Sequence, residues 1–186
     1  MSSSDGFRTV NQTVVHSWAM FSLLQSSVEA PSGEIFERTY VHTPGAVGIV
    51  ALTEDNHIVL VSQYRSSCDS SVLEIPAGMR DKDGEDPRVT AIRELQEETG
   101  YSGDECEFIG EMLSSPGVTD SAVIVYLMRG VVPGVSQPEG PEEQSMTMEV
   151  VPFATALLWV ESGKIADSKS AFGILLVARK YPHLVG

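Results

Sequence analysis

Apolar and polar positions along the chain predict a mixed α/β fold. Two apolar runs, residues 45–52 and 57–64, flank the polar tetrapeptide 53–56 and predict a β-hairpin. Short β-like runs precede them between Val14 and Tyr40, interrupted by a Pro-Ser-Gly turn at 31–33. Further strands are expected at residues 73–75, 106–113, 121–129 and 145–151, and amphipathic helices at 152–161 and 168–181.

Between the strands expected at 73–75 and 106–113, the pattern changes to that of a helix. Asp86 stands where an N-cap belongs, Pro87 where a first-turn proline is tolerated, and Gly100 where a helix ends in a left-handed conformation. Three apolar residues recur on one face and are expected to dock the helix on the core: Val89, Ile92 and Leu95.

The other face of this helix concentrates negative charge. Glu94, Glu97 and Glu98 are spaced i, i+3, i+4, and such like-charge pairs cost an isolated helix about 0.2–0.5 kcal/mol each. A divalent cation would remove the repulsion, and oxygen ligands suit Mg²⁺, Mn²⁺ or Ca²⁺. A plain solvated face is the other interpretation, because the chain has 26 acidic residues. The turn at 76–78 can bring a backbone carbonyl to the same ion.

Composition narrows the class of protein. A chain of 186 residues is long enough to bury a core as one domain, and its net charge of −14 argues against nucleic-acid binding. Cys68 and Cys106 are too few for a disulfide framework and lack metal-ligand spacing. Neither a basic-then-apolar leader nor a membrane-length apolar run is visible. We therefore expect a cytoplasmic protein.

The acidic helix and its approach closely resemble the signature of the Nudix hydrolases. That signature runs Gly, five residues, Glu, seven residues, then Arg-Glu-aliphatic-x-Glu-Glu-x-Gly-aliphatic. Gly78 opens it here, Glu85 is its first Glu, and residues 93–101 (RELQEETGY) complete it. Six residues rather than five separate Gly78 from Glu85, and Tyr101 replaces the aliphatic residue. The extra residue falls in a polar loop, where an insertion costs little loop-closure entropy.

Further stretches resemble the ADP-ribose pyrophosphatases of this family, particularly the bacterial members. The runs 63–65 (QYR) and 73–78 (LEIPAG) look like the approach to their signature, and Pro116 stands at their characteristic distance beyond it. The stretch 142–148 and the last helices are also similar. The resemblance covers about residues 14–180 and implies a mixed sheet sandwiched between helices.

The resemblance completes a metal site around the acidic helix. One turn apart, Glu94 and Glu98 should hold the principal ion, and the resemblance adds Glu97 and the Ala77 carbonyl. Mg²⁺ is expected, with Mn²⁺ as an alternative. More than one ion per site is expected, because clustered carboxylates with few compensating cations can bridge ions. Supporting roles are expected for Gly78, Glu85 and Arg93, with a salt bridge between the last two.

The general base and the substrate contacts are expected outside the helix. The resemblance places the base in the loop 134–144, at Glu142 or Glu143, alongside Glu97 as a catalytic residue; solvated loop carboxylates are an equally good interpretation. Substrate contacts are expected from Arg65, Arg38, Pro116 and Gly117. For both arginines the alternative is ordinary ion pairing at the surface.

The N-terminal third bears on assembly. Residues 14–24 are more apolar than a tail needs, and in ADP-ribose pyrophosphatases similar strands complete the partner's pocket. We divide the chain into a dimerisation segment, 1–44, and a hydrolase domain, 45–186. The predicted activity is Mg²⁺-dependent hydrolysis of ADP-ribose to AMP and ribose 5-phosphate by a homodimer. The alternatives are another nucleoside diphosphate sugar as substrate, or a nucleotide sensor without turnover.

Overall fold

A computed structural model describes residues 5–136 and 145–185. The chain divides into two compact units. The N-terminal unit comprises residues 1–45 and 113–121, and the main unit comprises residues 46–112 and 122–186. None of the helices described by the structure is both long and apolar enough to cross a membrane.

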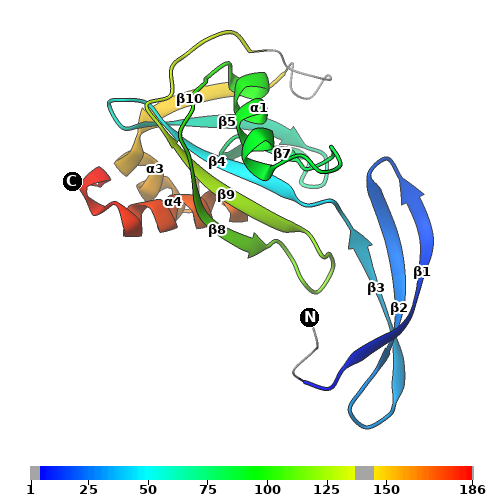
Figure 1. Cartoon of the computed structure of the whole chain (residues 1–186). Coiled ribbons are helices and arrows are strands. Elements are labelled where there is room, and N and C mark those ends of the chain that lie inside the picture. The colour runs from blue at the N-terminus through cyan, green and yellow to red at the C-terminus, as the bar shows by residue number, and fades with distance from the viewer. Residues whose placement is uncertain (1–4, 137–144, 186) are drawn as a thin grey trace. The chain divides into compact units, whose positions relative to one another are not determined.

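The main unit is built on a mixed seven-stranded sheet (Figure 1). Its path runs β10-β5-β4-β9-β8, with β6 added to β5 and β7 added to β4. β4 and β9 are parallel, while β4–β5, β5–β6, β4–β7 and β5–β10 are antiparallel. The strands are β4 (Ala46–Leu52), β5 (His57–Arg65), β6 (Ser70–Glu74), β7 (Ala77–Met79), β8 (Cys106–Leu113), β9 (Ala122–Arg129) and β10 (Thr147–Pro152).

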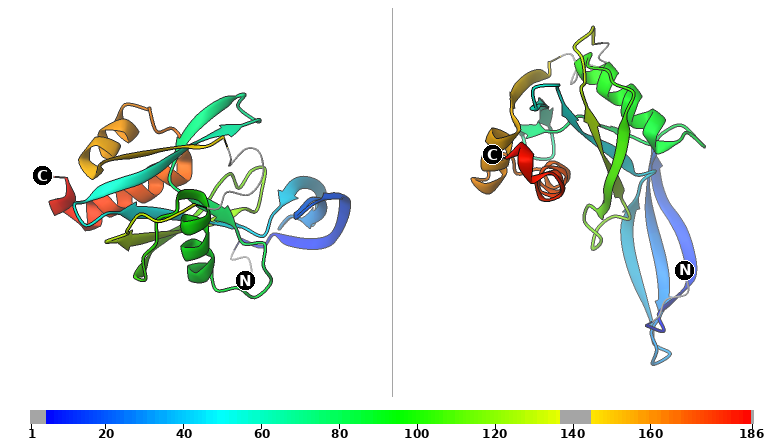
Figure 2. Two further views of the ribbon diagram at one scale, coloured as in Figure 1. Left: turned by 90° about the horizontal axis from the view of Figure 1, so that it is seen from above. Right: turned by 60° about the vertical axis from the view of Figure 1, so that its left-hand side comes forward.

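Helices cover both faces of this sheet. Figure 2 shows α1 (Pro87–Thr99) on one face, with α3 (Phe153–Glu161) and α4 (Ser168–Lys180) on the other. A short 3₁₀ turn, η1 (Pro182–Leu184), follows α4. Alternate residues of β4 supply the two cores, since Val50 packs in the α3–α4 layer and Ile49 in the α1 layer. The predicted mixed sheet between helices is therefore confirmed.

The ends of α1 follow from its sequence, but its buried face differs from the prediction. Asp86 caps the helix by accepting a hydrogen bond from the Arg88 N–H, and Gly100 ends it at φ 74°. The expectation that Val89 docks on the core is wrong, because its side chain is 52% exposed. The buried line instead steps four residues at a time through Ala91, Leu95 and Thr99.

The N-terminal unit is a three-stranded antiparallel sheet and one loop. The strands are β1 (Arg8–Trp18), β2 (Phe21–Glu29) and β3 (Ile35–His42), in the order β1-β2-β3. β1 begins earlier than the β-like run predicted from Val14. The loop 113–121 joins β3 through hydrogen bonds from the Val41 N–H to the Val118 carbonyl and from the Thr43 N–H to the Asp120 carboxylate. The Asp120 carboxylate also lies 2.6 Å from His42 Nδ1.

Candidate active site

The turn between β6 and α1 brings backbone and carboxylate into close contact. Gly78 lies so near the Glu94 side chain that a Cβ on this glycine would stand 2.0 Å from the Glu94 carboxyl carbon. Any larger residue here would displace that carboxylate. The glycine that opens the signature is therefore required by the close approach of β7 to α1.

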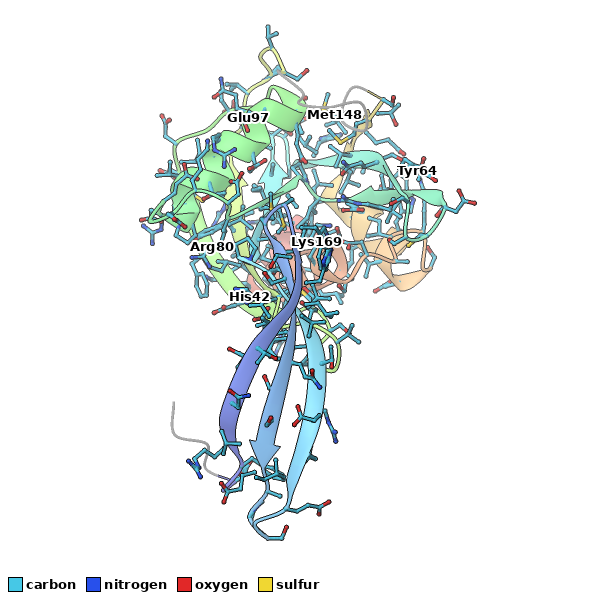
Figure 3. The ribbon with its side chains drawn as sticks, turned by 90° about the vertical axis from the view of Figure 1, so that its right-hand side faces the viewer. His42, Tyr64, Arg80, Glu97, Met148 and Lys169 are labelled. Atoms are coloured by element: carbon cyan, nitrogen blue, oxygen red, sulfur yellow. The ribbon has the colours of Figure 1, made fainter. Side chains whose placement is uncertain are left out.

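Arg93 gathers the carboxylates of the signature around one guanidinium. Its Nη1 lies 2.8 Å from a carboxylate oxygen of Glu94 and 2.8 Å from one of Glu97. Its Nη2 lies 3.4 Å from Glu85, so the ion pair expected between these two residues is present. Its Nε is buried and has no hydrogen-bond partner among the described residues. Glu97 is labelled on α1 in Figure 3, and its side chain is 31% exposed.

Crowding and burial alter the protonation of this cluster. Burial, helped by the charge of Glu97 and opposed by that of Arg93, raises the pKa of Glu94 to about 7. Burial lowers the pKa of Arg93, but Glu94 and Glu97 more than offset this and raise it above its usual value. Without a cation, Glu94 is therefore only partly ionised near neutral pH.

Glu98 completes the acidic face from the next helical turn. One of its carboxylate oxygens accepts a hydrogen bond of 3.0 Å from the Ala77 N–H, which fastens β7 to α1. With Glu98 held by Ala77 and the other two carboxylates held by Arg93, no three acidic, His or Cys side chains in the described part of the chain already form a metal-binding group.

The residues nevertheless suit a hard cation. Glu94, Glu97 and Glu98 share one helix face through their i, i+3, i+4 spacing, and oxygen donors are those that Mg²⁺ and Mn²⁺ prefer. The pKa of Glu94 is raised mainly because burial penalises its ionised form, which a bound cation would stabilise. A bound ion would replace Arg93 as the partner of the carboxylate oxygens of Glu94 and Glu97.

Arg65 is held in the main unit by Glu74, a residue without an expected role in the site. Its Nε and Nη2 donate hydrogen bonds of 2.8 and 2.7 Å to the two oxygens of Glu74. Glu74 is buried and also contacts Lys169 on α4. Glu74 and Lys169 are 95 positions apart, so no local pattern could have linked them.

The other three predicted substrate contacts come together in the N-terminal unit. Arg38, Pro116 and Gly117 line one cavity of about 550 Å³, together with Tyr40, Leu113 and Asp120. This volume falls within the range of small-molecule sites. The Arg38 guanidinium lies 4.4 Å from the centre of the Phe36 ring, and its Nη1 donates to the Glu37 carbonyl. The two candidates for the general base, Glu142 and Glu143, lie outside the described residues.

Comparison with known proteins identifies the class. The model of the NUDIX domain family matches residues 42–172. The chain therefore belongs to the Nudix family, as the signature predicted.

Two curated relatives span nearly all of this chain. An ADP-ribose pyrophosphatase of Mycobacterium tuberculosis is 38% identical over 172 residues, which cover 92% of this chain and 83% of the relative. A methanol dehydrogenase activator of Bacillus methanolicus is 35% identical over 167 residues, which cover 90% of each chain.

A solved structure confirms the fold. The crystal structure of an ADP compounds hydrolase matches with a TM-score of 0.79 over 95% of each chain, at 22% sequence identity. At this identity the match establishes the Nudix fold alone.

Proposed function

We propose that this chain hydrolyses the diphosphate bond of ADP-ribose, releasing AMP and ribose 5-phosphate. The observation that carries the proposal is that Glu94 and Glu97 meet at Arg93 while Glu98 binds the Ala77 N–H, next to the turn at Gly78, within a chain of the Nudix family. The name of the Mycobacterium tuberculosis relative supports ADP-ribose as the substrate.

Divalent metal, Mg²⁺ or Mn²⁺, is part of the proposal. Glu94, Glu97, Glu98 and the Ala77 carbonyl would hold more than one ion. When bound, such ions neutralise diphosphate oxygens and lower the pKa of a coordinated water. The protein supplies orientation, since Arg93 and Glu85 brace the helix and Arg65 offers a cation to the diphosphate. Glu142 or Glu143 is proposed as the base.

The experiment is AMP release by the purified protein from a panel of nucleoside diphosphate sugars, with Mg²⁺ and then with EDTA. Metal-dependent turnover strongest on ADP-ribose is expected. Stronger turnover of another sugar nucleotide would support the metal-dependent hydrolysis but refute ADP-ribose as the preferred substrate. Binding without turnover would move the protein to the sensor class. Such a sensor would not need Glu94, Glu97 and Glu98, all of which this chain retains.

We also propose a homodimer formed through the N-terminal segment 1–44, with each segment completing the partner's substrate pocket. Every residue of β1 is exposed within a single chain, including Val14 at 62% and Trp18 at 44%. An edge strand carrying such residues invites pairing or packing with another chain. A cytoplasmic setting accords with Cys68 and Cys106, both free thiols.

Sedimentation of the Val14→Asp variant tests the dimer, with Leu158→Asp as a matched control because Leu158 is 61% exposed on α3. Dissociation of the first variant alone is expected. A wild-type protein that is monomeric at micromolar concentration and fully active would contradict the proposal.

A further inference from the structure

Glu74 is a carboxylate buried at the end of β6, three residues before Ala77. Its side chain is 3% exposed, and burying an ionised carboxylate is costly unless cations and hydrogen bonds satisfy it. Two cations do so here, Arg65 from β5 and Lys169 from α4. Because both oxygens of Glu74 accept from Arg65, the pair has the two-point geometry that fixes the plane of a guanidinium.

The pair leaves one side of Arg65 available. The two hydrogen bonds to Glu74 use Nε and Nη2, and neither uses Nη1. The Arg65 side chain is 38% exposed, whereas its partner is almost fully buried. Glu74 thus holds Arg65 through Nε and Nη2, and the arginine is the exposed member of the pair.

A second layer of contacts fixes Glu74 from behind. Lys169 lies 3.0 Å from an oxygen of Asp167, the N-cap of α4, which accepts from the Ser170 N–H at 2.9 Å. Ser170 Oγ in turn accepts a hydrogen bond of 2.8 Å from the Ile75 N–H. The start of α4 therefore fastens Glu74 through an ion pair and the next residue, Ile75, through a neutral hydrogen bond. Lys169 is labelled in Figure 3.

This network also borders the acidic face of α1. Only Ile75 and Pro76 separate Glu74 from Ala77, whose N–H bonds to Glu98. Hydrogen bonding to Glu74 raises the pKa of Arg65, and the charge of Glu98 adds to the effect. Arg65 is therefore within electrostatic reach of Glu98, one of the carboxylates proposed to bind the metal.

We propose that Glu74, held by Lys169, is a positioning residue that orients Arg65 so that its Nη1 side binds the substrate diphosphate. The inference rests on the proposed function, because it takes that substrate as given. Glu74 itself touches no substrate; it acts through Arg65. The competing explanation is that the four charged groups only hold α4 against the sheet.

A double-mutant cycle separates these explanations. Glu74→Gln, Arg65→Ala and the double variant are compared by steady-state kinetics on ADP-ribose with Mg²⁺. Losing an oriented charge-assisted contact should raise KM by about ten- to a hundredfold, with kcat within a few-fold of the wild type. The double variant should be no worse than Arg65→Ala, because Glu74 has no effect once its target is gone. Independent, multiplicative effects of the two substitutions would overturn the proposal.

A matched control has the same chemistry at the other end of α4. Glu107 binds Lys180 and accepts hydrogen bonds from the Tyr181 hydroxyl, so Glu107→Gln also removes a carboxylate that fastens this helix. It should leave KM unchanged. A rise in KM equal to that of Glu74→Gln would mean that anchoring α4, and not orienting Arg65, is what matters.

Lys169→Met keeps the test decisive if Glu74→Gln does not fold. It leaves the Glu74–Arg65 pair in place but removes its second cation, so a smaller rise in KM is expected, relieved in Lys169→Arg. The same cycle with Arg65→Ala then applies, and additivity would again overturn the proposal.

Failure of the proposed function can be recognised separately. If the wild type releases no AMP, the cycle is repeated with the dissociation constant for ADP-ribose, measured by calorimetry, in place of KM. Non-additive loss of affinity would support the positioning role without turnover, and additive loss would refute it.

Discussion

β4 has two valines and β1 has three, yet the two strands have opposite environments. Every residue of β4 after Ala46 is buried between helices on both faces of its sheet, whereas every residue of β1 is exposed in the single chain. The main unit thus contains its own covering layers, whereas in the described part of the N-terminal unit no layer covers β1. Apolar composition alone does not decide burial, because a strand must also find a layer to pack against.

The largest effect on activity is expected at the proposed metal site on α1 of the main unit. Glu98→Gln should lower kcat on ADP-ribose by about 10³-fold or more, because Glu98 is a proposed metal ligand and losing its charge would weaken transition-state stabilisation. Kinetics with Mg²⁺ measure the loss, and circular dichroism on heating checks that the fold is retained. Glu105→Gln, at an exposed position just beyond the same helix, should keep full activity. Unchanged turnover in Glu98→Gln would refute the site.

A smaller effect is expected from the core that α3 and α4 cover in the main unit. Ile174 is fully buried on α4 in the layer shared with α3, so Ile174→Ala should lower the free energy of unfolding by about 2–5 kcal/mol. Urea denaturation measures the change. A loss below about 1 kcal/mol would show that the site collapses around the missing atoms, contrary to close packing.

The two units also differ in the burial of their ion pairs, and this difference should appear in the stability of the protein at low pH. Burial raises the pKa of Glu74, but hydrogen bonds and charge from Arg65 and Lys169 outweigh it and leave the pKa below its usual value. Its stabilising contribution is therefore complete above the pKa of an unfolded glutamate and is lost as pH falls through the lower folded pKa. Denaturation between pH 7 and 3 should show a steeper loss for the wild type than for Glu74→Gln.

The control for this experiment lies in the N-terminal unit. Glu29 pairs with Arg8 at the surface, where that arginine is 71% exposed, so the Glu29→Gln variant should follow the wild-type pH profile. Equal profiles for wild type and Glu74→Gln would instead show that the buried pair contributes no pH-dependent stability.

The smallest effect is expected on the uncovered face of β1. Val15 is 54% exposed, so Val15→Ala should change the unfolding free energy by less than about 0.5 kcal/mol at protein concentrations that favour the monomer. Chemical denaturation over a range of protein concentrations makes the test. A cost that grows with concentration would indicate that a second copy buries this residue.

Regular periodicity made much of the fold predictable from sequence. The hairpin of β4 and β5 and the caps of α1 are confirmed, because local residues determine them. The predicted buried face of α1 was wrong at Val89, because the helix turns Ala91 and Thr99, together with Leu95, toward the core instead. Local pattern also could not place the start of β1, whose polar residues pair with β2 across the sheet.

The candidate site was predictable only where its residues are close in sequence. The carboxylates of α1 follow from their spacing, whereas the contact of Glu74 with Lys169 depends on how α4 returns to the sheet. The same holds for Arg38 and Pro116, which line one cavity because the loop 113–121 pairs with β3. Tertiary contacts of this kind leave no mark in a single sequence.

Because β4 pairs in parallel with β9, the central strand can be paired on that side only after much of the chain has been synthesised. Ala46 pairs with Val123, so 77 residues must be added (123 − 46) before the central strand acquires its neighbour on that side. At about 5–20 residues per second, synthesis of that stretch takes roughly 4–15 s. During this interval the apolar edge of β4 has no strand paired with it on that side. We therefore expect chaperones to bind the nascent chain at this stage.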